Sequence, residues 1–239
     1  MMKQYFKIKE QNKDSILFFR LGDFYEMFYD DAKIASKELE LTLTGRDCGQ
    51  AERAPMCGVP FHSCEGYIAR LVAKGYKVAI CEQTEDPATA KGLVKRDIIR
   101  VITPGTVMES SMLDEGRNNY ICCMFSDSNK IGLCFCDIST GELYATEISG
   151  SDSVNSLTSQ LASYNPREIL IGGDIVKIKS LPAFIKSKLS AGVEMLRDES
   201  FDNKLCTDTV NMQFGEEMQC IADSQVLINA IGALINYLK

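Results

Sequence analysis

A short segment near the amino terminus, LGDFYEMFYDDA, combines aromatic rings with carboxylates. Its aromatic residues fall within six positions, and these are Phe24, Tyr25, Phe28 and Tyr29, with Glu26 among them. An exposed ring can stack on a planar group, and a neighbouring carboxylate can accept hydrogen bonds from that group. The same rings can also serve structure alone, because aromatic side chains at helical spacing usually face a core. The segment therefore allows two interpretations, a stacking site and a core helix.

Acidic residues in the second half raise the possibility of metal-dependent hydrolysis. Nucleases of this kind hold two metal ions between clustered carboxylates. Asp137 lies in a strand-like run and Glu142 in the turn after it, whereas Glu147 and Glu168 stand in poor positions to complete such a set. We therefore expect surface or turn acids here, with no catalytic residue.

The ten cysteines are accompanied by one histidine, His62. The cysteines lie in apolar runs such as CCMF and LCFC, and no second pair at zinc spacing accompanies Cys134 and Cys136. The opening residues, MMKQYFKIKEQ, lack the apolar core of a signal peptide. We expect reduced, mostly buried thiols and no metal site.

The elements around the aromatic segment can be predicted from local patterns. The apolar run Ile16–Phe19 predicts a strand that ends at Gly22. Asp23 then stands where a helix N-cap is expected, and Glu26 follows at the spacing of a capping box. The predicted helix continues through DDAKIASKEL, which would place Phe24 in its first turn.

The rest of residues 1–105 alternates between helical and strand-like patterns. Helices are predicted in YFKIKEQ and EGYIARLVAKGY, and strands in LTLTGRD, KVAICEQ and KRDIIRVITPG. CGQAERAP reads as a loop that leads to MCGVPFHS. This alternation predicts a mixed α/β domain, with a mixed sheet and flanking helices.

The second half has a different pattern. Three strand-like runs in YICCMFSDSNKIGLCFCDISTGELYATEIS are separated by the turn-forming stretches SDSNK and STGE. After them, helices are predicted at 154–163 and 181–189, and strands at 168–171 and 193–196. This order is typical of ribonuclease-H-like α/β folds.

Composition and charge limit the possible functions. Hydrophobic residues make up 45% and charged residues 25%, and no apolar run reaches the roughly 18 to 20 residues of a membrane helix. We therefore expect a cytoplasmic protein without a membrane partner. Residues 1–105 carry 16 Lys+Arg against 15 Asp+Glu, or +1, and the remainder carries 10 against 18, or −8. The net charge of −7 argues against a wholly electrostatic nucleic-acid binder, but the near-neutral first half leaves room for a local basic rim.

Four motifs carry a resemblance to a known family. They are FRLGDFYEMFYDDA (19–32), APMCGVPFH (54–62), VAICEQTEDPATAKG (78–92) and RVITPGT (100–106). In this order and spacing, the chain resembles the amino-terminal portion of the bacterial MutS family of DNA mismatch-repair proteins. The resemblance covers essentially the whole chain.

The resemblance implies a division into parts. It places a mismatch-recognition domain at 1–105, a linker at 106–116, a connector domain at 117–215 and the start of a lever and core helix at 216–239. The last part is expected to be one long amphipathic helix. It has no stop signal, which indicates that the sequence was cut there.

The resemblance also implies partners and cofactors. The connector would transmit conformational signals and dock MutL, and the parent protein would be a homodimer. A G-x-x-x-x-G-K-[ST] loop is absent from this sequence. We therefore expect no ATP hydrolysis and no cofactor in this portion, with ATP and Mg²⁺ bound by an ATPase domain elsewhere in the parent.

The implied DNA-binding residues are Phe24, Glu26, Arg46 and Arg96. In the family, a Phe-x-Glu motif contacts the mispaired base, and the two arginines match basic positions near the DNA. A ring inserted from the minor groove separates stacked bases, which is easiest where pairing is defective. Glu26 would accept a hydrogen bond from an exposed base edge, or donate one if protonated, and would weaken binding to normal duplex.

The leading hypothesis is therefore recognition of mismatches and small insertion/deletion loops in duplex DNA. Two alternatives stay open at this point. One is a protein-interaction module in which both halves dock partners, and the other is the metal-dependent nuclease. Dependence of a mismatch preference on Phe24 separates the first hypothesis from the second, and cleavage that requires Asp137 would support the third.

Overall fold

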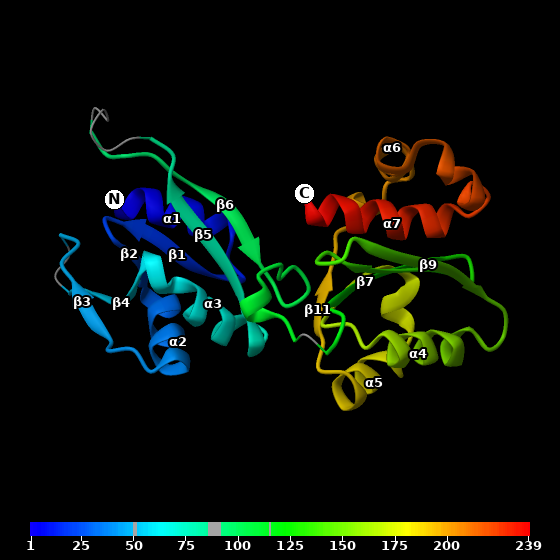
Figure 1. Ribbon diagram of the computed structural model, residues 1–239, viewed down its shortest axis with the longest axis horizontal. Helices are drawn as coiled ribbons and strands as arrows, with labels where there is room; N and C mark the ends of the chain where they lie inside the picture. The colour runs from blue at the N-terminus through cyan, green and yellow to red at the C-terminus, as the bar shows by residue number, and fades with distance from the viewer. Residues whose placement is uncertain (50–51, 86–91, 115) are drawn as a thin grey trace. The chain divides into compact units, whose positions relative to one another are not determined.

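A computed structural model describes residues 1–49, 52–85, 92–114 and 116–239. The chain divides into two compact units, Met1–Pro104 (unit 1) and Gly105–Lys239 (unit 2) (Figure 1). Within the described residues, no helix combines the length and apolar character that crossing a membrane requires.

Unit 1 is built on a six-stranded mixed sheet with the strand order β3-β4-β2-β1-β5-β6 (Figure 1). β1 and β5 are parallel, and every other pair is antiparallel. The strands are β1 (Ser15–Leu21), β2 (Phe24–Phe28), β3 (Thr44–Arg46), β4 (Ala54–Pro60), β5 (Lys77–Gln83) and β6 (Arg96–Ile102). The helices are α1 (Met2–Gln11), α2 (Tyr29–Leu39) and α3 (Cys64–Ala73). The predicted mixed sheet with flanking helices is confirmed.

Helices cover the two faces of this sheet. Side chains alternate along a strand, so Leu17 and Phe19 point to one face, where Tyr5 and Ile8 of α1 join them in a buried cluster with Phe28. On the opposite face, Cys57 Sγ of β4 donates a hydrogen bond to the backbone oxygen of Ala32 in α2, at 3.5 Å.

The predicted helix from Asp23 is wrong for its first five residues. Phe24–Phe28 forms strand β2, and Leu21 pairs directly with Phe24, so Gly22 and Asp23 make a two-residue hairpin turn. Gly22 has φ +59°, which glycine adopts without strain. The Asp-x-x-Glu spacing resembles a capping box. Glycine followed by aspartate between apolar runs is equally a hairpin signature, and the long-range pairing with β4 favours the hairpin.

Other elements of unit 1 show where local patterns are informative. The helix at the amino terminus, the helix that ends before Gly75 and the strands β1, β5 and β6 are confirmed. β3 is shorter than LTLTGRD predicts, and β4 was not predicted from APMCGVP. Its two prolines and its glycine weaken the strand pattern, yet it pairs with β2 and β3 on either side.

Unit 2 contains a five-stranded sheet with the order β11-β10-β7-β8-β9. β7, β8 and β9 are antiparallel, and β10 is parallel to both β7 and β11, which is the ribonuclease-H-like order that the sequence predicts. The strands are β7 (Tyr120–Asp127), β8 (Lys130–Asp137), β9 (Glu142–Ser149), β10 (Glu168–Gly173) and β11 (Gly192–Met195).

Helices lie on both faces of this sheet. α4 (Ser153–Tyr164) and α5 (Leu181–Lys188) bury Leu157 and Ile185 against the face that carries Met124. α6 (Asn203–Phe214) and α7 (Gln225–Leu238) cover the opposite face, which carries Cys123. The core of unit 2 is therefore closed on both sides.

The single long helix expected at 216–239 is wrong in its first part. A 3₁₀ segment occupies Gly215–Ile221, and α7 begins after Ser224, whose side chain accepts a hydrogen bond from Leu227 N. α6 was not predicted. α7 lies so close to β8 that a Cβ added at Gly132 would fall 2.1 Å from Val226 O, a tertiary constraint that periodicity does not encode.

Candidate nucleic-acid interface

Phe24 projects from a strand that is held on both sides. It pairs with Leu21 of β1 and with Pro60 of β4. Phe24 is nevertheless 47% exposed, whereas Phe28, on the same face of the same strand, is 0% exposed. A backbone fixed by two neighbouring strands therefore carries an accessible ring.

The hairpin turn before Phe24 is fastened by two further contacts. Arg20 Nε donates to Gly22 O at 2.6 Å, and Phe61 N donates to Asp23 O at 3.0 Å. The Arg20 guanidinium carbon lies 3.5 Å from the centre of the Phe61 ring, a cation–π contact. Both residues of the turn are therefore anchored, which limits movement of the ring that follows.

Arg20 continues into a network on the opposite face of β2. Its Nη1 lies 3.1 Å from Glu82 Oε1, and the Tyr25 hydroxyl also donates to that carboxylate. Burial and the Glu82 carboxylate raise the pKa of Tyr25, so its hydroxyl keeps its proton at neutral pH. Arg20, Phe61 and Glu82 are not predictable as a group from the sequence, because nothing in their spacing indicates that the sheet brings them together.

Glu26 and Arg46 form an ion pair at the same end of the sheet. The Glu26 side chain is 15% exposed and that of Arg46 is 37% exposed. Gly58 of β4 pairs with Glu26, and a Cβ added at Gly58 would lie 3.2 Å from Tyr25 O and 3.5 Å from Glu26 Cγ. The structure thus joins two of the predicted site residues and places them on the face that carries Phe24.

Arg96 is placed differently from the other three predicted residues. It is only 9% exposed. Its Nε donates to Arg20 O at 2.7 Å, and its Nη1 to Val94 O at 2.8 Å and Gln4 Oε1 at 3.2 Å. Burial lowers the pKa of Arg96, which reflects loss of solvent around its charge. This placement favours a structural role for Arg96 over the predicted contact with DNA.

Two other basic residues of the first half of the chain, Arg53 and Lys91, add little to this interface. Lys91 lies outside the described residues, and Arg53 is an exposed residue just before β4. The accessible candidate interface therefore consists of Phe24, Glu26 and Arg46, supported by Arg20 and Phe61.

The carboxylates of unit 2 are held by local donors. Asp137 accepts hydrogen bonds from Ser139 N at 3.0 Å, Ser139 Oγ at 2.6 Å and Asn119 N at 2.9 Å. Glu168 accepts from the Tyr237 hydroxyl at 2.8 Å and from Gly105 N at 3.0 Å. Among the described residues, no three potential metal ligands gather in one place. This arrangement gives the nuclease alternative no support.

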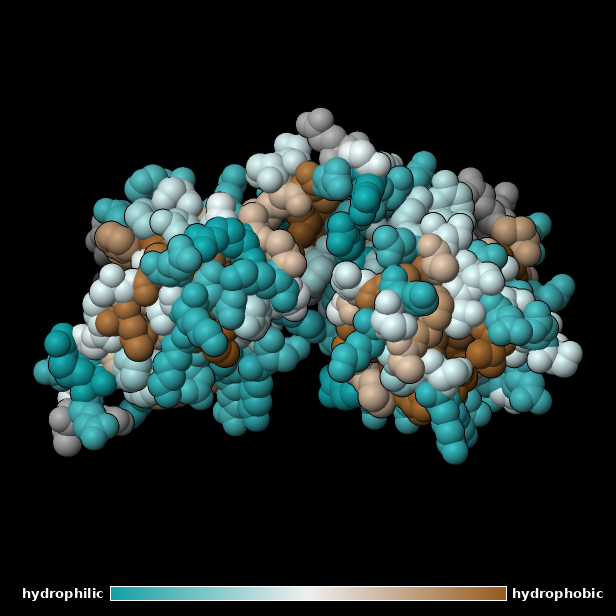
Figure 2. Space-filling view, turned by 90° about the horizontal axis from the view of Figure 1, so that it is seen from below, coloured by the Kyte–Doolittle hydropathy of each residue, from teal (hydrophilic) through white to brown (hydrophobic). Residues whose placement is uncertain are grey.

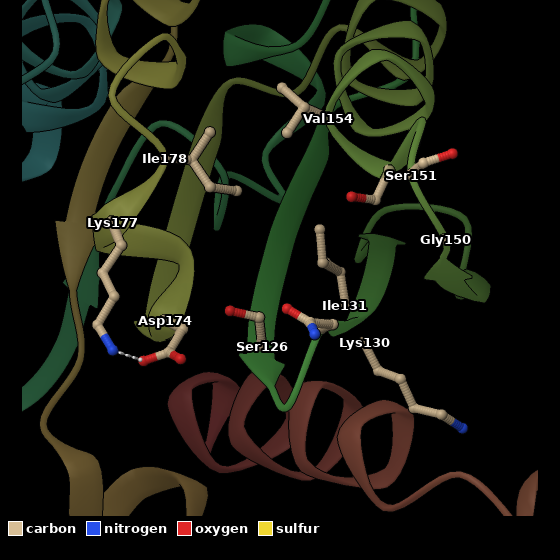
Figure 3. Close-up of a pocket in the computed structure, with 11 residues that line it drawn as sticks. Ser126, Lys130, Ile131, Gly150, Ser151, Val154, Asp174, Lys177 and Ile178 are labelled. Atoms are coloured by element: carbon tan, nitrogen blue, oxygen red, sulfur yellow. Dashed lines mark ion pairs between the residues drawn. The ribbon is translucent and has the colours of Figure 1, made fainter.

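Unit 2 also contains a cavity of about 570 Å³ beside the β7–β8 hairpin (Figure 3). Lys177 lines it in an ion pair with Asp174 at 2.6 Å, and Lys130 lines it while paired with Glu147 at 2.9 Å. An anion entering the cavity would compete with these carboxylates for both lysines.

Figure 2 shows hydrophobic side chains on one face of each unit as separate patches among hydrophilic residues.

Two family models match successive parts of the chain. Residues 1–111 match the family model described as MutS domain I, and residues 119–239 match the model described as MutS domain II. The chain is 51% identical over its whole length to the DNA mismatch repair protein MutS of Ruminiclostridium cellulolyticum. It is 50% identical over its whole length to the protein of the same name from Acetivibrio thermocellus, and 47% identical to that from Clostridium tetani.

These relatives are much longer than the chain. It covers 27% of the Ruminiclostridium protein and 28% of the Acetivibrio protein.

Proposed function

The chain belongs to the MutS family, and from this premise we propose that it is the DNA-inspecting part of a longer mismatch-repair protein. In this proposal, unit 1 recognises mismatches and small insertion/deletion loops by inserting Phe24 into the duplex. The observation that carries the proposal is the 47% exposure of Phe24 on a strand that is paired on both sides.

Insertion of Phe24 would depend on the energy that is needed to deform DNA. Inserting a ring unstacks a base step, which costs a few kcal/mol, and stacking of a base on that ring returns about 1–3 kcal/mol. At a mismatch the pairing is already weakened, so the same insertion costs less. Phe24 would therefore measure how easily the duplex deforms and would not read its sequence.

A rigid support strengthens this argument. A ring on a mobile loop would lose conformational entropy on insertion, whereas the strand pairing and the Arg20–Phe61 contact already order this one. Beside it, Glu26 would accept a hydrogen bond from the exposed edge of a mispaired base, and Arg46 would contact the sugar-phosphate backbone.

We assign the remaining family functions on the resemblance alone. Unit 2 would act as the connector that transmits conformational signals and docks MutL. The parent protein would be a cytoplasmic homodimer, and its ATPase domain, with ATP and Mg²⁺, would lie outside this chain.

The test compares the full-length protein with and without Phe24→Ala. Each is titrated onto a duplex with one G·T mismatch and onto its fully paired twin, at one fixed salt concentration. We expect the substitution to reduce the preference for the mismatch by about 10- to 100-fold, the equivalent of one lost stacking contact.

Phe6→Ala is the matched control, because Phe6 is 48% exposed on α1 of the same unit. It should leave the preference unchanged, and Phe24→Trp should retain it. If Phe24→Ala keeps the full preference for the mismatch while the protein stays folded, the proposed insertion of Phe24 is wrong. The protein-interaction module then becomes the better account.

A further inference from the structure

The ion pair between Glu26 and Arg46 stands in the way of the contacts that each would make with DNA. We propose that this pair is a charge lock, closed in the free protein and on paired duplex, which opens only at a defective base pair. Arg46 is then a specificity-determining residue that acts through Glu26. The inference rests on the proposed function, since it concerns the same interface.

The surroundings of the pair allow it to open. Within the part of the chain that the structure describes, the side chains of Glu26 and Arg46 have no hydrogen-bond or ionic partner other than each other. Arg46 is 37% exposed and lies on the short strand β3. Arg96 differs in both respects, because it is nearly buried and donates to three oxygen acceptors. Of these two arginines, only Arg46 can leave its partner without depriving several oxygen acceptors of their donor.

Opening the lock has different consequences on the two kinds of DNA. At a mismatch, Arg46 moves to a phosphate and Glu26 accepts a hydrogen bond from a displaced base, so both charges gain new partners. On paired duplex, the base edges are already hydrogen bonded. Glu26 would remain there as an unpaired carboxylate beside phosphates, which favours the closed pair. Exchange of partners is therefore favourable on mismatched DNA and unfavourable on paired DNA, and this difference increases the preference for the mismatch.

The experiment measures the salt dependence of binding to a fully paired duplex, using the full-length protein. Glu26→Gln removes the charge that holds Arg46, so Arg46 becomes free to bind a phosphate. We expect binding to tighten about tenfold at low salt. The slope of log K against log salt should steepen by about one, the signature of one added phosphate contact.

The double variant Glu26→Gln/Arg46→Met isolates the role of Arg46. We expect it to lose both the tightening and the steeper slope, whereas Glu26→Gln/Arg46→Lys, which keeps a cation, should retain most of the slope. Lys33→Met replaces Arg46→Met in a matched control, because Lys33 pairs with Asp30 on α2 of the same unit. Combined with Glu26→Gln, it should leave the added slope in place.

Two results overturn the lock. One is an unchanged salt slope for Glu26→Gln, and the other is an equal gain from Glu26→Gln whether or not Arg46→Met is also present. This readout uses paired DNA and does not involve base stacking, so it is distinct from the test of Phe24. If Phe24→Ala does not reduce the mismatch preference, the proposed insertion of Phe24 is overturned. If the salt slope does not change, only the charge lock is overturned.

Discussion

Glu26 and Glu168 are both glutamates on strands, but they differ in exposure and in the number of groups that they bind. Glu26, in unit 1, has a side chain that is 15% exposed and pairs with one partly exposed arginine, Arg46. Glu168, in unit 2, is 2% exposed and accepts from the Tyr237 hydroxyl and Gly105 N. A carboxylate with water nearby can change partners at little cost, whereas a buried one cannot release its donors without leaving them unpaired.

The same contrast holds within a single strand of unit 1. Phe24 and Phe28 share one face of β2, yet Phe24 is accessible and Phe28 belongs to the cluster beneath α1. Chemical type is therefore a poor guide to role in this molecule. Access to solvent separates residues that can meet a ligand from residues that hold the fold.

The largest expected effect concerns the two phenylalanines of β2. Phe28→Ala should lower the free energy of unfolding of unit 1 by about 3–5 kcal/mol, because it opens a cavity in the core. Phe24→Ala should change it by less than about 1 kcal/mol, since Phe24 is already 47% exposed. Hydrogen exchange of the β1 and β2 amides measures both effects. Similar losses for the two variants would show that Phe24 is also a core residue.

A smaller effect is expected for the two glutamates. Glu168→Ala should destabilise unit 2 by about 1–3 kcal/mol, because Gly105 N loses its buried acceptor, whereas the Tyr237 hydroxyl can still donate to Glu194 Oε2 at 2.9 Å. Glu26→Ala should cost less than about 1 kcal/mol, as expected for a partly exposed ion pair. Amide exchange in β10 and α7, compared with exchange in β2, reports the two effects separately. A larger loss for Glu26→Ala would reverse the comparison.

The smallest effect concerns the pH dependence of unit 2. Burial raises the pKa of Asp137, but hydrogen bonds from Ser139 and the Asn119 amide outweigh burial and leave the pKa below its ordinary value. A lowered pKa in the folded state contributes stability that is present above the unfolded pKa, about 3.9. This contribution should be lost as pH falls below about 4, through the folded pKa.

Asp137→Asn serves as the control for that measurement, since it cannot titrate. Unfolding of unit 2, followed by urea titration between about pH 5 and pH 2, should depend less on pH in this variant. If both proteins lose stability in parallel, another group causes the acid dependence.

Local patterns predicted much of the fold and less of the interface. The strands of unit 2 were predicted because turn-forming SDSNK and STGE separate apolar runs, and these signals act over a few residues. The helix predicted from Asp23 was wrong because Asp-x-x-Glu and Gly-Asp are competing local signals, and the distant strand β4 selects between them. α6 lacked a clear periodic signal and packs through tertiary contacts.

The sequence by itself determined which chemistry is present and in what order the elements occur, because residue type and short-range periodicity are local properties. It placed an aromatic–acidic motif and basic residues in the first half of the chain. Only the tertiary structure decided that Phe24 is accessible while Phe28 is buried, that Arg46 meets Glu26, and that Arg96 turns inward. Strand register sets the direction of each side chain and brings residues far apart in the chain together, and that register depends on pairings such as β2 with β4 that no short segment encodes.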